Sequence, residues 1–228
     1  MNTTKLPSIP VDVALRAVQA EAAAADVELL MPGSGGREAI LLGLAAVHAI
    51  SGDGWDLAYA RDHVSTTLPG AGAAAIAGLA LIPVAGPILA GLAAAFKRTT
   101  VSLSPAAMRD GVTLMATWRH EAGHVGAIKR GGLLWCVAYG VVPEVRAGGE
   151  APCYGADIAH AVHLAGSDVD KAAQAVIGAL ENYGLDEPAM RLARGIVLSN
   201  AESVRRGADP GDVVADTRAS LRAAGWVG

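Results

Sequence analysis

The chain has 228 residues, of which 52% are hydrophobic and 18% charged, and its formal net charge is −4. This length suits one medium domain or two small ones, and the composition excludes an intrinsically disordered chain. The basic residues are scattered, so nothing indicates a nucleic-acid-binding surface.

Hydrophobic residues recur at helical spacing over 10–30 and 37–50, which predicts two helices joined by a Gly-rich loop. A third helix is predicted over 54–65. The loop sequence GSGGRE does not fit the phosphate-binding pattern G-x-x-x-x-G-K-[ST], and that pattern occurs nowhere in the 228 residues. We therefore expect a helical N-terminal region over 1–69 with no phosphate-binding loop.

Residues 70–96 form an uncharged run that is followed at once by Lys97 and Arg98. The run is longer than the roughly 20 residues that span a bilayer. It is also rich in alanine and glycine, and Pro83 and Pro87 should kink or split it. Two interpretations stay open: insertion into a membrane, or a helical hairpin buried in a soluble protein or a homo-oligomer.

The expected cellular location depends on which of the two interpretations holds for the segment, taken as 70–98. If it inserts, the positive-inside rule places the C-terminal part in the cytoplasm, attached to the membrane. If it is buried, the protein is cytoplasmic. The N-terminus lacks the apolar run of a signal peptide, and Cys136 and Cys153 are expected to be buried thiols in a reducing compartment. Abundant Ala, Gly and Arg are typical of a high-GC genome, so a bacterial protein or a phage virion component fits.

The remaining range, 99–228, is predicted to be mainly helical. Ser104 suits an N-cap and Pro105 a first helical residue, for a helix that reaches about Arg130 and ends at two glycines. Residues 133–142, LLWCVAYGVV, are rich in strand formers and predict a strand, followed by a Pro/Gly-rich loop over 143–155. Further helices are predicted over 157–164, 167–182, 187–206 and 209–225. The fold class is therefore mainly α with a small β element.

The predicted helix that ends near Arg130 contains RHEAGHV at 119–125, with the pattern H-E-x-x-H. Positions i and i+4 share a helix face, so His120 and His124 can present two imidazole nitrogens to one Zn²⁺ ion. Glu121 is placed to hydrogen-bond a metal-bound water and to accept its proton as it attacks a carbonyl group. Ala122 and Gly123 are small enough for neighbouring elements to pack closely behind the site.

HEAGH resembles the zinc motif of the FtsH-type membrane-anchored metalloproteases. The resemblance implies that His120 and His124 bind zinc, that Glu121 is the catalytic base, and that an aspartate at the start of a later helix is the third ligand. Residues 165–174, AGSDVDKAAQ, are similar to that later stretch of the family, G-A-S-N-D-[IL]-E-Q-A-T, and match Asp168 to the aspartate. The resemblance covers about 105–182 and implies a zincin-like helical metallopeptidase domain within 99–228.

The chain departs from the family in three ways. The gap from His124 to Asp168 is shorter, the family's G-G-R-A-A-E stretch is missing, and a serine precedes Asp168 where the family has asparagine. Other third ligands therefore stay open. A metzincin site is excluded, because Arg130 stands where that site needs a histidine. The remaining candidates are Glu150, Glu181, Asp157, His160 and His163.

The sequence thus predicts a zinc-dependent metallopeptidase. Because the chain has no phosphate-binding loop for an ATP-driven unfoldase, its substrate is expected to be an already accessible polypeptide. The alternative is a structural or assembly protein, a component of a virion or a membrane complex, that retains a zincin-like fold. Three candidate ligands favour the enzyme, since structural zinc sites normally have four protein ligands and catalytic ones keep an open position.

Overall fold

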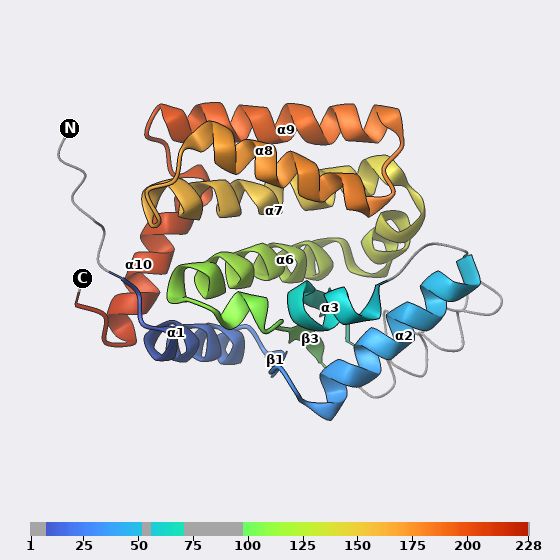
Figure 1. Cartoon of the computed structure of the whole chain (residues 1–228), viewed down its shortest axis with the longest axis horizontal. Helices are drawn as coiled ribbons and strands as arrows, with labels where there is room; N and C mark the ends of the chain where they lie inside the picture. Colours follow the sequence, from blue (N-terminus) through green and yellow to red (C-terminus); the bar gives the residue numbers. More distant parts are fainter. Residues whose placement is uncertain (1–7, 52–55, 71–97, 228) are drawn as a thin grey trace. The chain divides into compact units, whose positions relative to one another are not determined.

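The computed structural model describes residues 8–51, 56–70 and 98–227. These residues are mainly helical with one small sheet, which confirms the predicted fold class at that level (Figure 1). Residues 71–96 of the predicted hydrophobic segment lie outside the described residues, so both interpretations of that segment stay predictions. Across the described ranges, no helix combines the length and apolarity that a membrane span requires.

The chain divides into two compact units. Of the described residues, the first unit contains 8–18, 110–124 and 138–227. The second contains 19–51, 56–70, 98–109 and 125–137.

The sheet belongs to the second unit. Its strands are β1 (Val27–Leu30), β2 (Thr66–Leu68) and β3 (Thr99–Ser102), in the order β1-β3-β2. β3 lies parallel to β1 and antiparallel to β2. Helices α2 (Gly35–Ser51) and α3 (Leu57–His63) belong to the same unit and lie close to the predicted ranges.

A buried arginine joins three elements of the second unit. The guanidinium of Arg37, on α2, donates to the main-chain oxygens of Ala60 (3.3 Å), Arg61 (2.9 Å) and Val64 (3.0 Å). It also donates to the hydroxyl of Ser102 on β3 at 2.8 Å. Arg37 is 1% exposed, so it brings its positive charge to the negative end of α3 and donates to main-chain oxygens there, of which that of Ala60 also accepts from the N–H of Val64.

Helix α6 (Gly111–Val141) carries the H-E-x-x-H pattern and starts later than predicted. Its N-cap is Asp110, whose carboxylate accepts from the main-chain N–H of Thr113 at 2.9 Å. The predicted cap, Ser104, instead lies just before a 3₁₀ turn (Ala106–Met108), where its hydroxyl accepts from the N–H of Ala107 at 3.2 Å.

The two glycines after Arg130 interrupt α6 as predicted, but the residues beyond them differ from the prediction. Gly132 has φ 55° and ψ −148°, a conformation that favours glycine, and the chain then resumes a helical path to Val141. The predicted strand over 133–142 is therefore wrong. The predicted loop over 143–155 is also wrong, because these residues form most of α7 (Pro143–His163).

The other helices of the C-terminal part agree closely with the sequence-based prediction. They are α8 (Val169–Leu180), α9 (Glu187–Arg205) and α10 (Val213–Ala223). Asp168 caps α8 and Asp186 caps α9, each through its own carboxylate. Near the N-terminus, the first predicted helix is shorter than expected: α1 covers Val11–Ala24, and β1 takes up the rest of the range.

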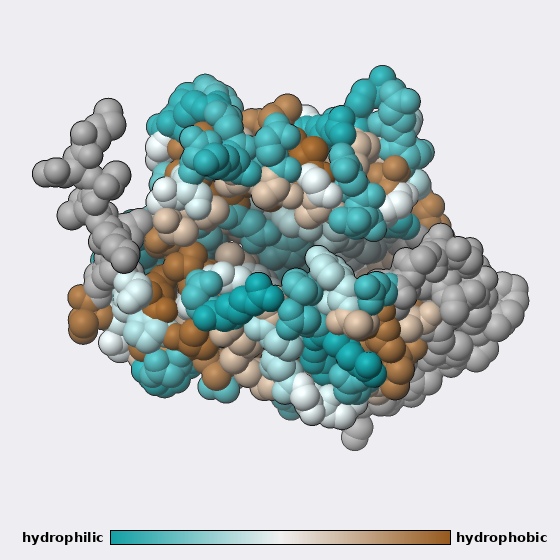
Figure 2. Space-filling view, in the orientation of Figure 1, coloured by the Kyte–Doolittle hydropathy of each residue, from teal (hydrophilic) through white to brown (hydrophobic). Residues whose placement is uncertain are grey.

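Small residues allow α7 and α9 to pack closely in the first unit, where α7, α8 and α9 lie side by side (Figure 1). On α7, the buried residues at a spacing of four are Ala147, Ala151, Gly155 and Ala159. On α9, they are Ala189, Ala193, Val197 and Ala201. A Cβ at Gly155 would lie only 2.6 Å from the side-chain nitrogen of Asn200 on α9. On the side shown in Figure 2, the surface over α8 and α9 is mainly hydrophilic, with scattered hydrophobic residues.

A chain of buried polar groups joins α6, α7 and α10 within the first unit. His160 donates from Nδ1 to the oxygen of Ala156 at 2.7 Å, so its Nε2 accepts from the hydroxyl of Thr217 at 2.9 Å. That hydroxyl in turn accepts from Nε of Arg119 at 3.1 Å. His160 and Thr217 are fully buried. Burial lowers the pKa of His160, and its bonds suit the neutral ring.

Ala151→Leu tests the close packing of α7 on α9. Leucine overfills a fully buried position, so we expect the free energy of unfolding to fall by about 1–3 kcal/mol in urea denaturation. Gly148→Leu is the matched control, because Gly148 is exposed and a Cβ there meets open space. The control should keep or raise the stability, since leucine favours a helix more than glycine does. Equal stability of the two variants would contradict close packing at Ala151.

Candidate metal centre

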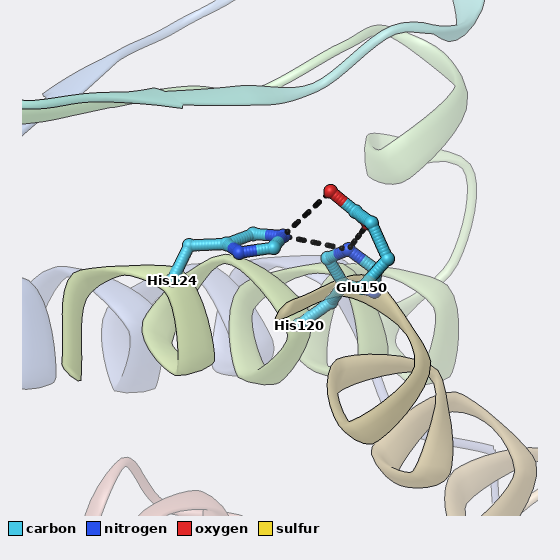
Figure 3. Close-up of side chains that lie close together, drawn as sticks. All are labelled: His120, His124 and Glu150. Atoms are coloured by element: carbon cyan, nitrogen blue, oxygen red, sulfur yellow. Dashed lines mark hydrogen bonds and ion pairs between the residues drawn. The ribbon is translucent and has the colours of Figure 1, made fainter. Parts of the chain in front are cut away.

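The two histidines of H-E-x-x-H lie on one face of α6, as their spacing predicts. His120 is 7% exposed and His124 8% exposed, so both rings are buried. Their Nε2 atoms are 3.2 Å apart, and the rings meet edge to face with centroids 5.0 Å apart. Figure 3 shows both Nε2 atoms turned toward the same point.

A carboxylate from α7 meets the two imidazoles at that point. Glu150 is 2% exposed; its Oε2 lies 3.4 Å from Nε2 of His120, and its Oε1 lies 3.5 Å from Nε2 of His124 (Figure 3). Among the described residues, His120, His124 and Glu150 form the one group whose ligand atoms could hold a metal ion. The Oε2 atom is buried and has no hydrogen-bond partner there.

The spacing of these three side chains is compatible with a tetrahedral zinc site. Bonds of 2.0–2.1 Å to a tetrahedral ion place its ligand atoms about 3.3–3.4 Å apart. The two Nε2 atoms lie 3.2 Å apart, and the carboxylate reaches His120 with Oε2 at 3.4 Å and His124 with Oε1 at 3.5 Å, each close to that range. With one ligand atom from each residue, the three atoms lie within 4.8 Å of one another. Two imidazoles with one glutamate are also a known ligand set of catalytic zinc, with a fourth position left open. The donor set and its spacing therefore fit a zinc ion.

Each of the three candidate ligands has a hydrogen-bond partner of its own. Asp157 accepts from Nδ1–H of His120 at 3.1 Å, which leaves Nε2 of that ring free for a metal. The thiol of Cys153 donates to the oxygen of Gly149 at 3.2 Å, and its sulfur lies 3.9 Å from Nδ1 of His124. The hydroxyl of Tyr139 donates to Oε1 of Glu150. Such partners orient metal ligands and fix their tautomers.

One face of α7 supplies most of this arrangement. Glu150, Cys153 and Asp157 stand at i, i+3 and i+7, a spacing that places them on the same side of a helix. α7 can approach α6 closely here because the motif contains Gly123, where a Cβ would lie 2.7 Å from the sulfur of Cys153. The expectation that a small residue in the motif permits close packing is thus confirmed at Gly123.

The electrostatics of the cluster favour positive charge on the imidazoles. Burial lowers the pKa of His124, but Cys153 and Glu150 outweigh it and raise the pKa to about 10. Burial likewise opposes protonation of His120, yet Asp157 and Glu150 hold its pKa well above the usual value. The two histidines keep the pKa of Glu150 far below its normal range despite burial. Protons and metal ions compete for the same imidazole nitrogens, so a cluster that favours protons there also suits a divalent cation.

Glu121, the predicted base, lies on α6 beside His120 and is 5% exposed. It is not a member of the three-residue group. Its negative charge helps to raise the pKa of His120.

The structure does not bring Asp168, the third ligand implied by the resemblance, into the group. Its carboxylate caps α8 and accepts from the N–H groups of Asp170 and Lys171, both at 3.0 Å. Glu181, another candidate, pairs with Arg194 at 3.3 Å. His163 contacts the main-chain oxygen of Ala208 at 3.2 Å. Among the alternatives that the residues left open, the structure places Glu150 with the two histidines.

Sequence reasoning missed the partner roles of Cys153 and Tyr139. The spacing of Glu150, Cys153 and Asp157 was a signal, but it becomes visible only when residues 143–157 are assigned to one helix. For Tyr139 we find no local signal, because its hydroxyl meets Glu150 eleven residues further along the chain.

No protein-family model, curated protein or solved structure matches this chain. The case for a function therefore depends on the geometry and chemistry of the site itself.

Glu150→Gln and Asp168→Ala together test which acid completes the site. Removing the charge of a direct ligand should weaken zinc binding by more than the roughly 10–100-fold that loss of an outer partner costs. Asp168→Ala should keep the zinc affinity and lose about 1 kcal/mol of stability with its N-cap. Competition with a chromophoric chelator measures the affinity, and thermal melting measures the stability. The opposite pattern, with affinity lost only in Asp168→Ala, would assign the third ligand to Asp168.

Proposed function

We propose that this protein is a zinc-dependent metallopeptidase that hydrolyses peptide bonds in accessible polypeptides. The observation that carries the proposal is the meeting of His120, His124 and Glu150 at separations suited to a tetrahedral ion. These three residues would hold the zinc. When bound, zinc polarises a carbonyl group and lowers the pKa of a coordinated water.

The number of ligands supports a catalytic over a structural role. The group has three members among the described residues, whereas structural zinc sites are normally closed by four. Cys153, the nearest thiol, is hydrogen-bonded to Gly149 and is not part of the group. A site with three protein ligands leaves a coordination position open for a water molecule or a substrate carbonyl.

Glu121 would act as the general base and then as the general acid. Its carboxylate accepts a proton from the water whose oxygen attacks the carbonyl carbon of the scissile peptide bond. The same proton passes to the amide nitrogen as the carbon–nitrogen bond breaks, so the products are a carboxylic acid and an amine, which become carboxylate and ammonium by transfer of one proton. The position of Glu121, buried beside His120, supports this assignment.

The composition of the 228 residues limits the substrate class. They have no phosphate-binding loop to drive unfolding of a substrate. The ligands are deeply buried, so only a narrow, extended chain could approach them. We therefore propose flexible, unstructured polypeptides as substrates.

Glu121→Gln tests the proposal. The amide keeps the size of the side chain but cannot accept the proton, so cleavage of reduced, unfolded casein should fall by about 10²–10⁴-fold. The zinc content, measured by atomic absorption, should remain about one ion per chain. Zinc removal by a chelator should abolish wild-type cleavage, and zinc re-addition should restore it.

Equal cleavage by the wild type and Glu121→Gln would refute the peptidase assignment. Zinc binding without any cleavage by the wild type would favour the alternative of a structural or assembly protein with a zincin-like site.

A further inference from the structure

Tyr139 is attached to α7 at two points that are four residues apart. Its main-chain oxygen accepts from Nε of Arg146 at 3.2 Å, and its hydroxyl donates to Oε1 of Glu150. Positions 146 and 150 lie one turn apart on α7, so both bonds come from the same side of that helix. The Tyr139 ring also meets His124 edge to face, with centroids 6.0 Å apart.

The hydroxyl bond makes the two oxygens of Glu150 unequal. Oε1 accepts from Tyr139 and lies 3.5 Å from Nε2 of His124. Oε2 is buried with no hydrogen-bond partner among the described residues and lies 3.4 Å from Nε2 of His120. A carboxylate that is held at one oxygen cannot rotate freely about its last bond. The bond to Tyr139 therefore fixes which oxygen remains available to a cation.

We propose that Tyr139 is a positioning residue for the metal centre: its hydroxyl holds Glu150 so that Oε2 is presented to the ion. This inference rests on the proposed zinc site, and it adds a residue that touches none of the reacting atoms. The second half of α6 thereby contributes one side chain, Tyr139, that positions a candidate ligand. Asp157 and Cys153 contact the histidines; Tyr139 is the partner of the acid ligand.

Tyr139→Phe tests the proposal, with Tyr154→Phe as the matched control. Phenylalanine keeps the ring and its contact with His124 but lacks the hydroxyl. Tyr154 also packs against a ligand, with its ring 4.6 Å from that of His120, but its hydroxyl pairs with that of Tyr183 at 3.1 Å. The two variants thus lose the same atom near the same site, and one of them loses a bond to a ligand.

We expect Tyr139→Phe to bind zinc about 10–100-fold more weakly in chelator competition, and Tyr154→Phe to match the wild type. With Co²⁺ in place of zinc, the visible absorption bands should shift in Tyr139→Phe and stay unchanged in Tyr154→Phe, because they report the ligand geometry. Thermal melting of the metal-free proteins checks that both variants fold.

A measurement on the wild type covers the case in which Tyr139→Phe does not fold. Zinc titration should change the near-ultraviolet absorption of tyrosine, since the charge around the carboxylate that Tyr139 contacts changes. No such change in a wild type that binds zinc would overturn the proposal.

Three other results would overturn the positioning role of Tyr139. Unchanged zinc affinity and Co²⁺ bands in Tyr139→Phe would overturn the positioning role while leaving the zinc site in place. The same unchanged values with slower cleavage would also overturn it, since the hydroxyl would then act on the substrate. Absence of zinc binding by the wild type would overturn the zinc site and this inference together.

Discussion

The first unit depends on one buried carboxylate placed between two buried imidazoles. An isolated charge in a protein interior costs several kcal/mol, so Glu150 is tolerable only if positive charge lies beside it. His120 and His124 lie within ion-pair distance of it and have raised pKa values, which favours that charge, and a divalent ion would provide it more strongly. The packing of α7 on α6 at this point therefore depends on positive charge, and the buried Oε2 atom, which accepts no hydrogen bond from the described residues, is where that charge is needed.

Small side chains allow that arrangement to form. Gly123 lets Cys153 approach α6, and Gly155 lets Asn200 of α9 approach α7. A Cβ at either point would come within 3.0 Å of that side chain, so the side chain or its helix would have to shift. The sequence has few aromatic residues and many alanines and glycines, and these small residues allow helices to pack closely. Close packing brings the candidate ligands of two helices together.

Local sequence signals predicted the parts of the fold that depend on local physics. The spacing of His120 and His124 on one helix face needs only helix geometry, and Asp186 with Pro188 predicted the start of α9. The strand formers of 133–142 and the prolines and glycines of 143–155 misled the assignment. Pro143 occupies the first turn of α7, where a proline is tolerated, and Pro152 lies on its exposed side. Tertiary packing then overrides the remaining local preferences. The choice between Glu150 and Asp168 could not be made from the sequence for a related reason: it depends on which helix packs against α6, and that is decided by contacts far apart in the chain.

The outer partners also bear on how the site would take up an ion. Asp157, Cys153 and Tyr139 contact the two rings and the carboxylate and hold them in place through bonds of the protein itself. The ligands would then need little rearrangement when an ion binds, so little conformational entropy would be lost on binding. We therefore expect this site to fold before it binds a metal, unlike small zinc domains that are unfolded without the ion.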